Sequence, residues 1–116
     1  MTGLAEVLRG LAARDGVQGA VLLSGEGLPI EHEGTGFESE TVAALAAALG
    51  QYAGRLGEGA DRGQLRLAVL DFARGPMVLA RAGSSAWLAI LAHPESDIGP
   101  LLYDLRQHGP ALAGLL

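Results

Sequence analysis

Two strand-like runs that are apolar on both faces constrain this chain more than any other feature. Val17–Ser24 reads VQGAVLLS, and Ala86–Ala92 reads AWLAILA. A strand with two apolar faces has to be covered on both sides, which places it in the middle of a sheet. We therefore predict a central pair of strands, with helices on both faces of the sheet.

The remaining elements follow from periodicity and turn residues. Apolar side chains recur at helical spacing in about Thr2–Arg14, in Glu40–Leu56 and in a last helix that starts near Ser96. Ser39 is the predicted N-cap of the second helix. Gly109-Pro110 should break or kink the last helix, because proline lacks an amide hydrogen and clashes with the preceding turn. The other predicted strands are Leu28–Glu33, Gln64–Phe72 and Met77–Ala82.

Charge and proline distinguish the two edges of the predicted sheet. The second strand carries Pro29, Glu31 and Glu33, which are typical of a protected edge. Short connections from the third strand to the fifth leave the third strand outermost on the other side. The 116 residues are thus predicted to form a single α+β domain. Its order is α-β-β-α-β-β-β-α, with a five-stranded antiparallel sheet of order 2-1-5-4-3 and helices on both faces.

The predicted helix Glu40–Leu56 has a stripe of large apolar residues nearly opposite a stripe of very small ones. The large stripe consists of Val42, Leu45, Leu49, Tyr52 and Leu56. The small stripe consists of Ala43, Ala47, Gly50 and Gly54. We predict that the large stripe faces the core and that the small stripe lets a second helix approach closely. The alternatives are that the small residues pack on the chain's own sheet or reflect coding bias.

This helix leads into the poorly protected third strand, in which only Arg66 and Asp71 are charged. An unpaired edge of this kind invites pairing with another chain. We therefore predict a twofold homodimer that joins edge strand to edge strand and helix to helix. The predicted interface residues are Ala43, Ala47, Gly50, Gly54, Leu65, Leu67 and Val69.

The sequence offers no recognisable catalytic or metal-binding cluster. His32, His93 and His108 lack the spacing of metal ligands, and there is no cysteine. Gly25-Glu26-Gly27 suits a hairpin turn and does not extend to a phosphate-binding loop. Trp87 lies in an apolar strand and is predicted to belong to the core. We expect no catalytic, cofactor-binding or metal-binding residues, and therefore no enzyme.

The net charge of −5 argues against nucleic acid or an anionic membrane as the main partner. The chain has no apolar run of the roughly 20 residues that span a bilayer and no signal-peptide pattern, so a cytoplasmic location is expected. An acidic segment is formed by Glu31, Glu33, Glu38 and Glu40. We interpret it as a solvated face, with recognition of a basic patch on a partner as the alternative.

Five segments have the residues and the order of a known domain family. They are Gly16–Ser24 (GVQGAVLLS), Gly25–Ile30 (GEGLPI), the Ala-rich Val42–Leu49, the strand entry Gly63–Leu65 and Ala86–Leu91 before the closing helix. Together they resemble the Roadblock/LC7 domain family over nearly the whole chain. The resemblance implies the element order given above and dimerisation through the second helix and third strand. Bacterial and archaeal members of this family commonly partner Ras-like small GTPases.

We therefore predict a non-catalytic dimeric interaction module that partners or scaffolds a Ras-like small GTPase. One alternative is a GTPase-activating protein acting in trans, a role found in one bacterial branch of the family. Arg55, Arg62 and Arg66 would then be the candidates for an arginine finger. The other alternative is a small-molecule sensor domain, which no convergent set of polar residues supports.

Overall fold

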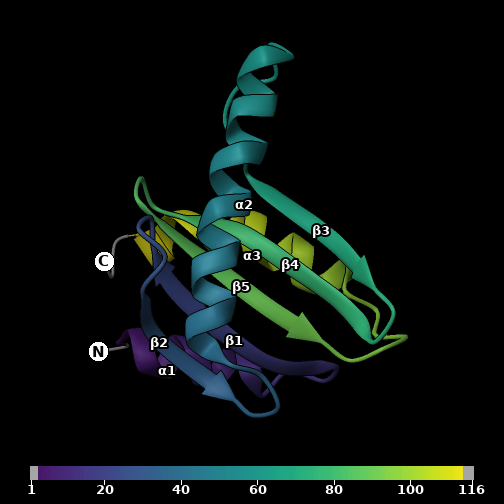
Figure 1. Ribbon diagram of the computed structural model, residues 1–116. Helices are drawn as coiled ribbons and strands as arrows, with labels where there is room; N and C mark the ends of the chain where they lie inside the picture. The colour runs from purple at the N-terminus through teal and green to yellow at the C-terminus, as the bar shows by residue number, and fades with distance from the viewer. Residues whose placement is uncertain (1–2, 114–116) are drawn as a thin grey trace.

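The computed structural model describes residues 3–113 and has the predicted order of helices and strands (Figure 1). The helices are α1 (Leu4–Ala12), α2 (Ser39–Gly59) and α3 (Gly99–Ala113). The strands are β1 (Val17–Ser24), β2 (Pro29–Gly34), β3 (Leu67–Phe72), β4 (Gly75–Ala82) and β5 (Ala86–Ala92). Both central strands have the bounds that their apolar runs predict. The predicted start of α1 at Thr2 lies outside the described residues.

The five strands form one antiparallel sheet in the order β2-β1-β5-β4-β3, which confirms the predicted order. Consecutive side chains of a strand point to opposite faces. In β1, Leu22 therefore enters one core, whereas Val21 and Leu23 enter the other. The two central strands are covered on both sides, as their composition predicts.

Helices cover the two faces unequally (Figure 1). The core on one face packs Leu8 of α1 and Leu101 of α3 against the sheet. The core on the other face contains Trp87 and the alanines of α2, which crosses the sheet alone. Trp87 is thus a core residue, as predicted. No helix among residues 3–113 is both long and apolar enough to cross a bilayer.

The ends of the helices differ from the prediction, since α1 ends at Ala12 instead of Arg14 and α2 continues past Leu56 to Gly59. α2 begins at Ser39 itself, with Glu38 as the N-cap residue. α3 begins at Gly99, three residues after Ser96, and the Asp97 carboxylate accepts a hydrogen bond from the Gly99 amide at 3.0 Å. Of the break or kink predicted at Gly109-Pro110, the break is wrong, since α3 is assigned as one helix to Ala113.

Candidate association surface

The orientation predicted for α2 is wrong, because its small residues face the sheet and most of its large ones face solvent. Ala43 and Ala47 are 0% and 3% exposed and pack in the core beneath the helix. Leu45, Tyr52 and Leu56 are 66%, 68% and 74% exposed. The alternative in which the small stripe packs on the chain's own sheet is therefore the correct one.

Trp87 of β5 is the physical reason for this orientation. A Cβ atom added to Gly50 would lie 2.6 Å from Cε2 and Cζ2 of the Trp87 ring, so only glycine fits above the indole. Arg81, opposite Trp87 on β4, places its guanidinium carbon 4.5 Å from the ring centroid. A large ring on the sheet requires small residues on the helix that covers it.

This packing changes which predicted interface residues are accessible. Ala43, Ala47 and Gly50 are covered by their own chain and offer no surface to a partner. A Cβ atom added to Gly54 would have no neighbour within 4 Å, so this position remains open. The accessible surface of α2 instead carries Leu45, Tyr52 and Leu56. The prediction that these large residues face the core is wrong.

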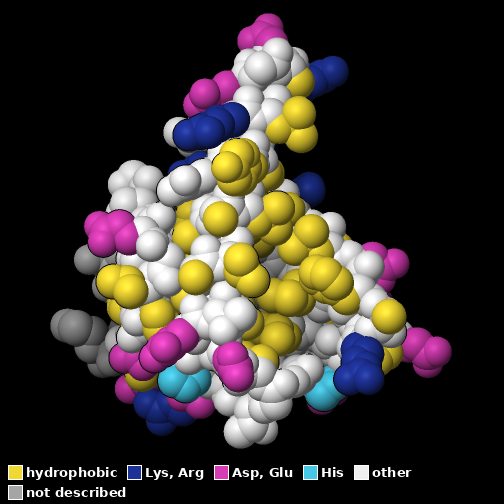
Figure 2. Space-filling model, in the orientation of Figure 1, with side chains coloured by type: hydrophobic (Ala, Val, Ile, Leu, Met, Phe, Trp, Pro, Cys, Tyr) yellow, Lys and Arg dark blue, Asp and Glu magenta, His cyan; other side chains and the backbone are white. Residues whose placement is uncertain are grey.

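An apolar groove separates α2 from the two outer strands, β3 and β4. It encloses about 220 Å³ and carries almost only apolar side chains. Figure 2 shows these side chains as a continuous yellow area beside the helix. The residues that line the groove include Val42, Leu45 and Leu49 from α2, Leu70 and Phe72 from β3, and Met77 from β4. Exposed apolar surface of this kind is typical of interaction sites and of ligand-binding grooves.

The C-terminal half of α2 projects beyond the sheet (Figure 1). The helix has 21 residues and is therefore about 32 Å long, longer than the sheet beneath it can cover. Tyr52 and Leu56 lie on this half and are exposed. The projecting half thus presents large apolar side chains that no other described part of the chain covers.

The free edge of β3 has three residues whose backbone groups point outward. Phe72 and Gly75 close the two-residue β3–β4 turn, and the Arg81 amide donates to the Arg66 carbonyl at 3.0 Å. Pairs bonded to β4 therefore fall on the even-numbered residues of β3, and the groups of odd-numbered residues face away from β4. The outward residues are Leu67, Val69 and Asp71, which include two predicted interface residues.

The side chains of β3 are divided between the two faces of the sheet. Val69 lies opposite Val78, which belongs to the core under α1 and α3. Leu70 and Phe72 lie on the α2 side, where they line the groove. Leu65, also predicted at the interface, is partly buried against the α2-side core.

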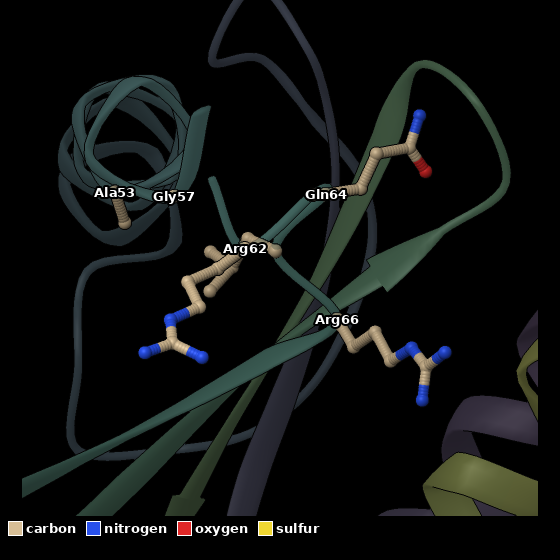
Figure 3. Close-up of a pocket in the computed structure, with 7 residues that line it drawn as sticks. Ala53, Gly57, Arg62, Gln64 and Arg66 are labelled. Atoms are coloured by element: carbon tan, nitrogen blue, oxygen red, sulfur yellow. The ribbon is translucent and has the colours of Figure 1, made fainter. Parts of the chain in front are cut away.

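The turn from α2 into β3 forms a hollow, which we call the α2–β3 hollow, with two arginines at its rim. Its lining comprises Ala53, Gly57, Arg62, Gly63, Gln64, Leu65 and Arg66. The Arg62 amide donates to the Gly57 carbonyl at 2.7 Å, and Arg81 Nε donates to the Leu65 carbonyl at 3.1 Å. In Figure 3 the side chains of Arg62 and Arg66 both point away from Gln64 but diverge from each other, Arg62 to the lower left and Arg66 to the lower right. Sequence reasoning missed this hollow.

Titratable side chains do not gather into a reactive centre in the part of the chain that the structure describes. His32 and His93 are exposed and lie on β2 and directly after β5. No three His, Cys, Asp or Glu residues among those described come close enough to hold a metal ion. The ion pairs between described side chains are Arg9–Glu33 and Arg14–Asp104. His108 falls in α3, where its side chain is not described.

Comparison with known proteins agrees with this architecture. The sequence profile of the Roadblock/LC7 domain matches residues 4–92. A Roadblock/LC7 domain from Streptomyces avermitilis is 28% identical, with a TM-score of 0.86 and coverage of 97% of both chains. The gliding protein MglB from Thermus thermophilus is 19% identical, with a TM-score of 0.85, covering 99% of this chain and 93% of that chain. Among functionally curated proteins, no sequence match emerges.

A third similar structure is described as MglB with a tetrameric arrangement. It is 19% identical, has a TM-score of 0.86 and covers 99% of this chain and 92% of that chain. At this level of identity the likeness concerns the fold. The three structures together place the whole described chain within one domain architecture.

Proposed function

The chain belongs to the Roadblock/LC7 family, and on that basis we propose that it is a non-catalytic module that dimerises through α2 and β3 and binds a Ras-like small GTPase. The observation that carries the proposal is the position of three features on one side of the molecule. These are the unpaired edge of β3, the apolar groove beside it and the projecting end of α2. Each lacks a partner among residues 3–113, and a second copy supplies all three.

A twofold axis perpendicular to the sheet at Val69 satisfies the edge of β3. Val69 then lies opposite Val69 of the second copy, and Leu67 lies opposite Asp71 in both directions. All three residues direct their free backbone groups toward the partner strand. The result is one antiparallel sheet of ten strands, with α2 of both copies on the same face.

The same axis brings the projecting half of each α2 over the groove of the other copy. Tyr52 and Leu56 then cover the surface between α2 and β3 of the second copy. Burial of a side chain such as Leu56 contributes about 1.5–3 kcal/mol, and the symmetry doubles the contribution. The tetrameric arrangement described for a similar MglB structure supports self-association as a property of this fold.

A GTPase has a free surface to bind in such a dimer. Ala44, Ala48, Gln51 and Arg55 form an exposed flank of α2, on the side of Gly27 and away from the groove. Each copy of α2 presents this flank at the outside of the dimer, and its small residues Ala44 and Ala48 let a partner approach the helix closely. The family's association with Ras-like small GTPases supports this class of partner.

The experiment that tests the proposal has two readouts. Sedimentation velocity should give twice the chain mass of 11.9 kDa, and the dimer should bind a Ras-like GTPase encoded near it in the genome. A monomer at all concentrations would contradict the dimer. Loss of GTPase binding on Ala48→Glu, with the dimer intact, would place the GTPase on the exposed side of α2.

GTP turnover by the same complex tests the alternative that this chain is a GTPase-activating protein. Arg55 is exposed and places its guanidinium carbon 5.6 Å from the centroid of the Tyr52 ring, on the side proposed for GTPase binding. GTP turnover that accelerates with the wild type but not with Arg55→Ala would identify an arginine finger. Unchanged turnover supports the scaffold.

A further inference from the structure

We propose that charged residues at opposite ends of α2 select a second copy of this chain as the partner. Arg62 and Arg66 of one copy bind Glu38 and Glu40 of the other, twice in the dimer. This inference rests on the twofold arrangement proposed above. It specifies which chains can form that arrangement.

Within one chain, the start of α2 and the α2–β3 hollow lie beside opposite ends of β3. The apolar groove is lined by Thr41 and Val42 at the start of α2 and by Leu70 and Phe72 at the end of β3. The start of α2 therefore lies level with the end of β3. The α2–β3 hollow, in contrast, lies directly before the start of β3.

Antiparallel pairing of two β3 strands sets the start of one strand opposite the end of the other. The hollow of one copy consequently faces the start of α2 in the second copy. With Val69 on the axis, Arg66 lies opposite Phe72 of the second copy. Phe72 is 53% exposed on the α2 side and offers its ring to the guanidinium.

Neither set of charges has a counterion among the described residues of its own chain. Arg62 and Arg66 are exposed, and neither takes part in an ion pair or a side-chain hydrogen bond with another described residue. Glu38 and Glu40 are exposed as well, and neither takes part in a described ion pair. The Glu38 carboxylate accepts one hydrogen bond, from the Thr41 hydroxyl at 3.0 Å, and retains further acceptor sites.

The turn that carries the arginines is fixed before any partner arrives. The Arg62 amide bonds to the end of α2, and the Arg66 carbonyl accepts from the Arg81 amide. A Cβ atom on Gly57 would lie 2.8 Å from the Gly63 carbonyl oxygen, which shows how closely the turn follows the helix. A fixed turn loses little freedom on binding, so its charges favour a defined partner.

Overall charge makes a local attraction necessary. Each copy carries a net charge of −5, so two copies repel at long range. Glu58 and Asp61, at the same end of α2 as the arginines, add to that repulsion. The acidic start of α2 and the arginines of the hollow are the complementary charges that this arrangement brings together. Of the four glutamates of the acidic segment, Glu38 and Glu40 thereby gain a partner in the second copy.

The test is a charge exchange between two double variants. Arg62→Glu/Arg66→Glu and Glu38→Arg/Glu40→Arg should each weaken the homodimer by about tenfold or more, measured by sedimentation. An equimolar mixture of the two should form a heterodimer, identified by its intermediate mass in native mass spectrometry. Arg106→Glu, at an exposed position on α3, is the matched control and should leave the dimer unchanged.

Each outcome separates this inference from the proposed dimer. Unchanged homodimers of both double variants would overturn the inference and leave the dimer standing, whereas a monomeric wild type would overturn the dimer itself. Glutamates at a helix start also stabilise their own helix. Weakened homodimers that do not recombine in the mixture would therefore assign the effect to the helix and overturn the inference. Glu38→Gln/Glu40→Gln, checked by circular dichroism, removes the charge without opposing the helix dipole.

Discussion

The two edges of this sheet differ in almost every respect. β2 begins with a proline, carries Glu31 and Glu33, and pairs with β1 through an irregular register beside Leu23. β3 pairs regularly with β4 over all six residues and contains one charge, Asp71. Charges, proline and bulges are the devices that prevent edge-to-edge association. The β2 edge has all three, whereas the β3 edge has a single charge.

The position of α2 reinforces this difference. Beside β2 the helix is in close contact with the sheet, because a Cβ atom on Gly27 would lie 3.1 Å from the Ala44 Cα atom. Beside β3 the helix leaves an apolar groove. Because α2 packs closely on the β2 side only, the sheet beside β3 remains partly uncovered. That side is the one with the unprotected strand.

The largest expected effect comes from placing a charge on the β3 side of α2. Leu56→Glu should weaken the dimer by about 3–6 kcal/mol, since two copies of the side chain leave the interface. Equilibrium sedimentation over a concentration series measures the change. Leu28→Glu is the matched control, because Leu28 is 62% exposed near the β2 edge and should leave the dimer intact. Equal effects of both substitutions would remove the distinction between the two sides.

A proline in β3 tests the direction of its backbone groups. Val69→Pro removes an outward amide that the fold does not use, so the monomer should stay folded while the dimer weakens by about 1–3 kcal/mol. Ala68→Pro removes an amide directed at β4 and should instead lower the melting temperature. Circular dichroism and sedimentation of both variants give the comparison. The reverse pattern would show that the outward residues are wrongly assigned.

The sheet could be predicted from the sequence because its signals are local. Pro29 and the neighbouring glutamates identify an edge, and the two fully apolar runs identify the centre. Short hairpin connections from β3 to β4 and from β4 to β5 then leave one possible strand order, β2-β1-β5-β4-β3. None of these steps requires knowledge of which side chain meets which across the core.

The orientation of α2 could not be predicted because it depends on one contact between distant elements. The two stripes of the helix are both apolar, so hydrophobicity does not say which faces the sheet. The contact with Trp87 determines which stripe faces the sheet, and Trp87 lies 37 residues from Gly50 in the sequence. A rule that pairs the bulkiest strand residue with the smallest helix residues would have found the orientation. The α2–β3 hollow was missed for a similar reason, because Arg81 of β4 holds its turn.

Gly50 tests that decisive contact. Gly50→Ala should destabilise the monomer by about 1–3 kcal/mol, because the methyl group would overlap the Trp87 ring. Urea denaturation of a monomeric background such as Leu56→Glu separates this effect from dimerisation. Restoration of stability on combining Gly50→Ala with Trp87→Phe would confirm that the ring is the obstacle. An unchanged midpoint for Gly50→Ala would show that the core yields at this position.

Gly54, one turn further along α2, gives the smallest expected effect and the opposite sign. Its Cβ position is open, so Gly54→Ala should stabilise the monomer by about 0.5–1 kcal/mol through reduced freedom of the unfolded chain. The same urea experiment in the Leu56→Glu background measures it. Sedimentation of Gly54→Ala alone then tests the interface predicted from the sequence. A weakened dimer would mean that the second helix approaches Gly54 closely, whereas an unchanged dimer would leave the large residues of α2 as the surface that the second copy covers.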